Sequence, residues 1–103
     1  MGKYRIRTAS RIDGQLLQHT QFLSNVSIKA AKRFRDEYAE TLRSIRDNPY
    51  QFPYDTDRNL PEGLYRKAIF ARRYKALFYV NDDTVYLDAV VDCRMDVSNY
   101  GLS

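Results

Sequence analysis

The most informative segment of this chain is RYKALFYVNDDTVYLDAVVDCR, residues 73–94. Two runs rich in Tyr, Phe, Val and Leu, residues 74–80 and 83–91, flank the polar pair Asn81-Asp82. Aromatic and β-branched residues favour strands, and a two-residue polar connection is typical of a β-hairpin. The segment therefore predicts two antiparallel strands joined by a tight turn.

A turn at that place fixes the register of the two strands. Counting back from it sets Lys75 opposite Asp88 on a polar, aromatic and basic face, while the other face is apolar and belongs to the core. A slip of one residue would bury Lys75 and Asp88 together, which is costly, so the first register is favoured. The core face then pairs Val80 with Asp83, Phe78 with Val85, Ala76 with Leu87, and Tyr74 with Ala89. The polar face carries Arg73, Lys75, Tyr79 and Tyr86.

A third strand is predicted just upstream, over residues 64–70, where apolar and aromatic residues return. The segment before it, residues 50–63, contains prolines, Gly63 and several Asp and Asn residues, all of which favour turns. Aromatic side chains within this segment predict an ordered loop. They are Tyr50, Phe52 and Tyr54.

Two helices are predicted in the first half of the chain. The clearer one begins after Ser27, a possible N-cap, and ends before Pro49, which cannot continue the hydrogen-bond ladder. Its apolar stripe consists of Ile28, Ala31, Phe34, Tyr38, Leu42 and Ile45. The other helix follows Ser10, and its stripe consists of Ile12, Leu16, His19, Leu23 and Val26. Because so few residues connect the two helices, we expect an antiparallel helical hairpin.

Residues 3–8 alternate apolar with basic side chains, which predicts a first strand. The predicted order is β-α-α-β-β-β. It describes an α+β fold with an N-terminal strand, an antiparallel helical hairpin and a three-stranded antiparallel meander, the antiparallel sheet packing on the hairpin. A length of 103 residues predicts a single domain, residues 1–103.

The charge of the chain favours an anionic partner. Lys and Arg number 17 against 13 Asp and Glu, a net charge of +4, although ordinary small domains carry similar charges. Cys93 is the only cysteine and His19 the only histidine, so we expect no disulfide, no metal site and a reducing, cytoplasmic location. Without an apolar run of about 20 residues, no membrane contact is expected. We predict that His19 packs against the second helix and that Cys93 is a small buried filler.

The ordered set of features resembles the RelE/ParE superfamily, the toxins of bacterial type II toxin-antitoxin systems. It comprises the strand, the helical hairpin, Asn48-Pro49, the aromatic-proline loop, Leu64-Tyr65-Arg66-Lys67, residues 73–80, the acidic turn, residues 85–91 and Asp92-Cys93-Arg94. The resemblance covers nearly the whole chain. It implies a growth-inhibiting toxin, of the kind that also serves in plasmid stabilisation, which a cognate acidic antitoxin protein neutralises.

Two mechanisms follow from the resemblance. RelE-like members act on the ribosome as mRNA interferases that cut mRNA without a metal or other cofactor, whereas ParE-like members inhibit DNA gyrase. The basic sheet face slightly favours mRNA cleavage. Ala68 stands where RelE has an additional lysine, and the long helical hairpin looks more like ParE. A third alternative is a non-enzymatic module that binds RNA or an acidic peptide.

Metal-free RNA cleavage requires crowded Lys, Arg and Tyr side chains that activate the 2′-hydroxyl and stabilise the developing charge. By position, the resemblance implies a catalytic set of Arg66, Arg73, Lys75, Arg94 and Tyr100. A substrate-binding set would consist of Tyr79 and Tyr86, which can stack on bases, together with Lys67 and Arg72. We expect the replacement of Arg94 or Tyr100 by Ala to relieve toxicity while leaving the fold intact.

Overall fold

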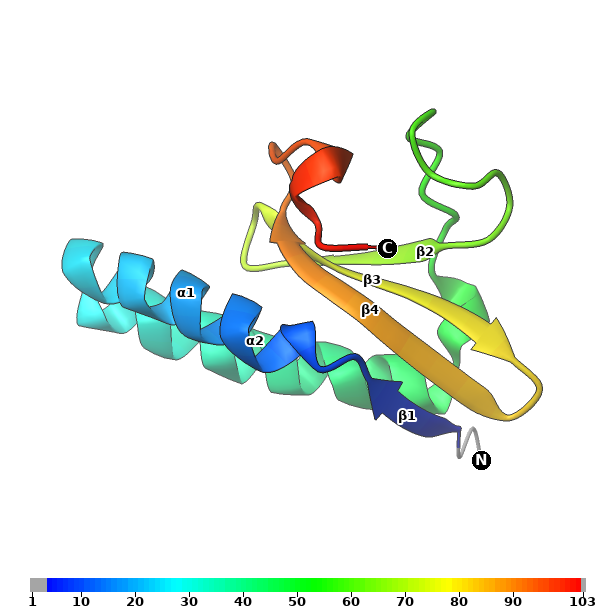
Figure 1. Cartoon of the computed structure of the whole chain (residues 1–103). Helices are drawn as coiled ribbons and strands as arrows, with labels where there is room; N and C mark the ends of the chain where they lie inside the picture. Colours follow the sequence, from blue (N-terminus) through cyan, green and yellow to red (C-terminus); the bar gives the residue numbers. More distant parts are fainter. Residues whose placement is uncertain (1–3, 103) are drawn as a thin grey trace.

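The computed structural model describes residues 4–102 and confirms the predicted order of elements (Figure 1). The elements are β1 (Arg5–Thr8), α1 (Arg11–Val26), α2 (Ile28–Asp47), β2 (Arg66–Phe70), β3 (Tyr74–Asn81) and β4 (Thr84–Asp92), with two short 3-10 helices, η1 (Pro49–Gln51) and η2 (Val97–Asn99). Part of the predicted first strand, at Lys3, lies outside the described residues. The chain therefore has the α+β fold that its periodicities predict.

The helical hairpin forms where the sequence places it. Ser27 separates α1 from α2, and its hydroxyl accepts a hydrogen bond from the backbone N–H of Ala30 at 3.3 Å. At the other end of α2, the side chain of Asn48 accepts from the backbone N–H of Tyr50 at 3.1 Å, and Pro49 stops the helix. Ser10 differs from the prediction, because it has helical backbone angles and its side chain makes no capping hydrogen bond.

The sheet has the strand order β1-β4-β3-β2. Strands β2, β3 and β4 form the predicted antiparallel meander. The first strand differs from the expectation of an all-antiparallel sheet, because β1 pairs in parallel with β4 and makes the sheet mixed. The meander leaves one edge of β4 free, and β1 fills that edge.

The turn between β3 and β4 lies one residue later than predicted. Asn81 pairs with Thr84 and Val80 with Val85, so the two turn residues are Asp82 and Asp83. Asp82 has a φ of 57°, and aspartate is among the residues that tolerate this left-handed conformation. The prediction of Asn81-Asp82 was wrong because Asn and Asp are both suited to such turns, so residue type does not distinguish Asn81-Asp82 from Asp82-Asp83.

A β-bulge in the meander separates Lys75 from its predicted partner. The register shifts between Leu77 and Phe78, so that Phe78 pairs with Leu87 and Leu77 with Ala89. Asp88 is therefore the extra residue of β4, and Lys75 lies opposite Val91. The predicted pair of Lys75 with Asp88 was wrong for two reasons: the later turn moves the partner of Lys75 by two residues, to Val90, and the bulge moves it by one more, to Val91.

Both faces of the sheet are covered (Figure 1). The helical hairpin covers one face, and its core consists of Ile12, Phe34, Ile45, Ala68, Phe70, Tyr74, Ala76, Phe78, Val85, Leu87 and Val90. A second core on the other face consists of Leu60, Tyr65, Leu77, Ala89, Val91 and Tyr100. The loop before β2 and the C-terminal segment supply this second cover, so the face predicted to be polar and open is largely closed.

The only histidine and the only cysteine of the sequence differ in their burial. His19 is buried, and its Nε2 donates a hydrogen bond to the carbonyl oxygen of Val90 at 2.7 Å, since a carbonyl can only accept. Its ring lies 5.8 Å from Phe34 of α2 and 4.8 Å from Tyr74, which confirms the packing role. Cys93 is exposed, so the prediction of a buried filler was wrong; β4 ends one residue before it.

Candidate functional site

The structure places the five residues of the predicted catalytic set in three separate environments. Lys75 and Tyr100 lie together under the C-terminal segment, Arg66 lies on the helix-facing side of β2, and Arg73 and Arg94 share a carboxylate at the end of the sheet. These environments differ in exposure and in charge.

Lys75 is buried in an ion pair with Asp55, and the two side chains are 7% and 4% exposed. The other oxygen of Asp55 accepts from the backbone N–H of Asp57 at 3.1 Å. Burial by itself raises the pKa of Asp55, but the hydrogen bonds from Lys75 and Asp57 outweigh it, and the pKa is lowered overall. Burial likewise opposes the charge of Lys75, but Asp55 and Tyr100 raise its pKa overall. Both groups are therefore charged at neutral pH.

Tyr100 closes this cluster from the C-terminal side. Its side chain is 1% exposed, and the Nζ atom of Lys75 lies 5.2 Å from the centre of its ring. The side chain of Gln15 donates to the backbone oxygen of Tyr100 at 2.8 Å, which ties the segment to α1. A tyrosine this deeply buried cannot reach an RNA strand without rearrangement of the segment. Because Tyr100 is so deeply buried, we now expect Tyr100→Ala to destabilise the fold, in contrast to the expectation from the sequence.

Arg66 faces away from Lys75. It pairs with Phe78, so its side chain lies on the helix side of the sheet, whereas Lys67 lies on the side of Lys75. Its guanidinium donates to the backbone oxygen of Phe52 at 2.7 Å and lies 4.1 Å from the centre of the Tyr54 ring. Because side chains alternate along a strand, no small shift brings Arg66 to Lys75.

Arg73 and Arg94 are brought together, as predicted, by Asp92. The Nε of Arg73 lies 3.4 Å from one oxygen of Asp92, and Arg94 contacts both oxygens at 3.2 Å. Burial opposes ionisation of Asp92, but the hydrogen bonds from Arg94 lower its pKa overall. Arg94 is 71% exposed, which makes this pair of arginines accessible to solvent. Arg72, also exposed, precedes them in the β2–β3 turn with a φ of 74°.

The two predicted stacking residues stack on each other. The rings of Tyr79 and Tyr86 lie 5.0 Å apart at an angle of 17°, as a direct cross-strand pair. Tyr65 contacts Tyr79 edge-on at 5.8 Å, and its hydroxyl donates to Asp88 at 2.6 Å. Both Tyr79 and Tyr86 are half-buried, so this surface offers the edges of an aromatic cluster.

Three residues of this region were not foreseen from the sequence. Arg11 donates to the backbone oxygen of Asp88 at 2.7 Å, and Gln15 accepts from the backbone N–H of Val90 at 2.8 Å. They satisfy backbone groups that the bulge removes from the strand ladder. Asp55, the partner of Lys75, lies in a loop without periodicity, so no pattern pointed to it.

Within residues 4–102, no group of three or more His, Cys, Asp or Glu side chains is arranged to hold a metal ion. None of the helices in this range is long and apolar enough to cross a membrane. The accessible side chains of the described site are mainly cationic, because Arg72 and Arg94 are exposed and Arg73 lies beside them.

The comparisons with known proteins identify the fold. The sequence matches no known family profile and no curated protein sequence. The structure is similar to a solved chain described as "Chromosomal ParDE TA system from P. aeruginosa", with a TM-score of 0.68 and 13% sequence identity. The alignment covers 89% of this chain and 98% of that chain. The protein thus shares, over nearly its whole length, the fold of a chain from a ParDE system.

Proposed function

We propose that this protein is the toxin of a bacterial type II toxin-antitoxin pair and that it arrests growth by binding a target protein. The observation that carries the proposal is the similarity in fold, which spans both chains almost from end to end. Because fold by itself does not define activity, the mechanism is argued from the site.

The site supports binding more than RNA cleavage. Cleavage requires the cationic and phenolic groups to converge on one phosphate. Here Lys75 is held by Asp55, Tyr100 is buried, and Arg66 lies on the opposite face of the sheet. Inhibition of DNA gyrase in the ParE mode needs no such constellation and is the mechanism we favour.

A second candidate, ribosome-dependent mRNA cleavage, is favoured by one observation. Arg73 and Arg94 are gathered on Asp92, and exposed Arg72 precedes them in the β2–β3 turn, so together they could hold a phosphate. This candidate requires the C-terminal segment to move on the ribosome and release Tyr100. It would make the protein a metal-independent endoribonuclease acting on mRNA.

Both candidates imply the same cellular setting. The protein would act in the cytoplasm and would be neutralised by a cognate antitoxin, an acidic protein encoded beside it. Co-expression of that neighbour should restore growth. A chain that leaves growth unaffected at high expression would instead fit the non-enzymatic binding module.

The deciding experiment is induction of the full chain without its neighbour, with translation and DNA supercoiling followed in parallel. Loss of supercoiling while amino-acid incorporation initially continues is the expected result. Purified protein should also inhibit supercoiling by purified gyrase. An immediate stop in translation with cuts in mRNA would replace this mechanism with the nuclease.

A further inference from the structure

The tip of the helical hairpin, where α1 turns into α2, is positively charged. Between Asp13 and Asp36 the sequence contains no acidic residue, but it contains the cations Lys29, Lys32, Arg33 and Arg35. Among the described residues, only Arg33 of these four forms an ion pair, at 3.9 Å from Glu37. The other three cations are exposed and form no ion pair within the described residues.

The same tip exposes large apolar side chains. Phe22 is 53% exposed, Val26 70% and Ile28 81%. Phe22 and Val26 are four residues apart and so lie on one face of α1, and Ile28 is the first residue of α2. A single exposed apolar side chain needs no explanation, but three within seven residues form a patch of the kind found at interaction sites.

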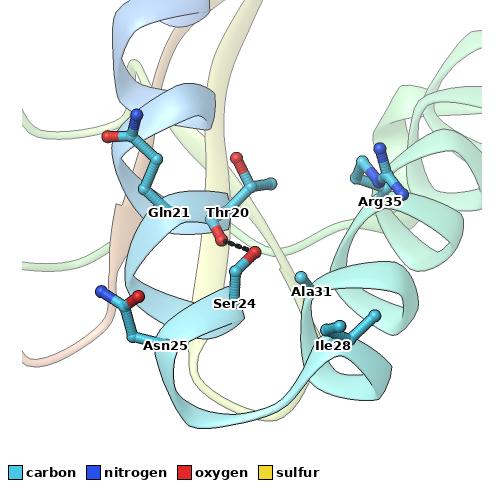
Figure 2. A pocket seen from close by; sticks show the side chains of 7 residues that line it. All are labelled: Thr20, Gln21, Ser24, Asn25, Ile28, Ala31 and Arg35. Carbon is cyan, nitrogen blue, oxygen red and sulfur yellow. Dashed lines mark hydrogen bonds between the residues drawn. The ribbon is translucent and has the colours of Figure 1, made fainter.

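A groove between the two helices combines one of these apolar side chains, Ile28, with one of the cations, Arg35 (Figure 2). Its volume is about 560 Å³, and its lining consists of Thr20, Gln21, Ser24, Asn25, Ile28, Ala31 and Arg35. The hydroxyls of Thr20 and Ser24 donate to backbone oxygens of α1, so their hydrogens are already used. The remaining donors are the guanidinium of Arg35 and two side-chain amides. No carboxylate lines the groove.

We propose that the hairpin tip is a docking surface for a protein partner whose binding segment carries Asp or Glu beside aliphatic side chains. A guanidinium can hold a carboxylate through two parallel hydrogen bonds, and Arg35 is free to do so. Ile28, beside it in the groove, provides the aliphatic contact. The groove is lined by neither Arg73 nor Arg94, although Phe22 beside it on α1 lies 5.8 Å from the guanidinium of Arg73, and the proposal does not depend on the target of the toxin.

Two other occupants fit the surface less well. A symmetric contact with a second copy would bring the same four cations against each other, and like charges across an interface are unfavourable. Single-stranded nucleic acid is held by stacking on aromatic rings, and the lining of the groove contains none; the one exposed ring nearby, Phe22, lies against Arg73 instead. An acidic, aliphatic protein segment matches both the charge and the apolar surface.

The test is an NMR titration of the isotope-labelled full chain with a synthetic peptide in which Glu and Leu repeat at helical spacing. We expect chemical-shift changes at the backbone amides of residues 20–35, and weaker binding of the same peptide with Gln in place of Glu. Arg35→Gln and Ile28→Ser should each weaken binding on the order of tenfold. Arg43→Gln is the matched control, because it removes the same charge from the same helix beyond the groove, and it should bind as the parent does.

Several outcomes would overturn the proposal. Shifts outside the hairpin tip, no binding, or an equal loss in Arg43→Gln would show that the peptide senses only net charge or does not bind. Tighter binding of a single-stranded RNA oligomer at the same amides would assign the surface to nucleic acid. Concentration-dependent broadening of these amides in the free chain would assign it to a second copy.

Discussion

Lys75 and Asp55 form an ion pair in which both side chains are almost fully removed from water. Such a pair contributes little net stability, because desolvation of two charges offsets their attraction. Removing one partner is different, since it leaves the other charge buried and unpaired. The cluster with Tyr100 is therefore sensitive to single changes.

Lys75→Met should lower the free energy of unfolding by about 3–5 kcal/mol, because it leaves the carboxylate of Asp55 without its cation. The double variant Lys75→Met/Asp55→Leu should recover most of that loss. Urea unfolding measures both. Arg43→Met, which breaks the exposed pair with Glu40, should cost less than about 1 kcal/mol. Equal losses of unfolding free energy in Lys75→Met and Arg43→Met would contradict the burial of the Lys75–Asp55 pair.

The same pair predicts how stability depends on pH. The pKa of Asp55 is lower in the folded protein than the ordinary value of 3.8 for an aspartate, so its ionised form stabilises the fold above about pH 4. That stabilisation is lost as the pH falls from about 4 toward the folded pKa. In urea titrations at several acidic pH values, Asp55→Asn should therefore show a flatter dependence than the parent. Asp36→Asn, at an exposed position, is the control and should keep the parent's slope.

At the scale of elements, the bulge at Asp88 links β4 to α1. The bulge frees the carbonyl of Asp88 and the N–H of Val90, and Arg11 and Gln15 bind them. Gln15 also holds the backbone of Tyr100, so one side chain joins the helix, the strand and the C-terminal segment. The bulge therefore helps to position the cover over Lys75.

Gln15→Leu should cost about 1–3 kcal/mol, since it leaves a backbone donor and a backbone acceptor without partners. Hydrogen exchange at the amide of Val90 should accelerate in parallel. Gln18→Leu, on the exposed side of the same helix, should change stability by less than about 0.5 kcal/mol. An unchanged exchange rate of the Val90 amide in Gln15→Leu would show that water replaces the Gln15 side chain as its hydrogen-bond partner.

The C-terminal segment gives a test of the two mechanisms. Tyr100→Ala should destabilise the fold by about 3–5 kcal/mol, because a large ring leaves a cavity. Tyr100→Phe keeps the ring, and under the binding mechanism it should keep growth arrest at full strength. A stable, folded Tyr100→Phe protein that no longer arrests growth would instead assign the hydroxyl a role in chemistry.

The elements that the sequence predicts well are those with a repeated pattern. The stripe of α2 and the alternation of β3 depend only on local periodicity, and both appear where expected except at Ile28, the first residue of the stripe, which is 81% exposed. The bulge was missed because Asp88 continues the polar alternation of β4 without interruption. The ion pair of Lys75 was missed because Asp55 comes from a loop whose path over the sheet is set by tertiary packing.

At the scale of the whole molecule, stability should be unevenly distributed. β3 lies between two cores, with Ala76, Leu77 and Phe78 fully buried, whereas the hairpin tip around Val26 and Ile28 is exposed. Opening the tip disrupts few apolar contacts, but opening β3 requires separation of both cores.

Native-state hydrogen exchange should therefore divide the chain in two. Amides of β3 should exchange only through global unfolding, so that their protection equals the free energy from urea unfolding. Amides at the end of α1 should exchange through local opening with clearly lower protection. If the tip is the docking surface proposed above, the Glu-Leu peptide should raise the protection of the tip amides. The exchange of the β3 amides should still occur only through global unfolding. Tip amides as protected as β3 in the free chain would contradict this division, because they would show that the tip opens only when both cores do.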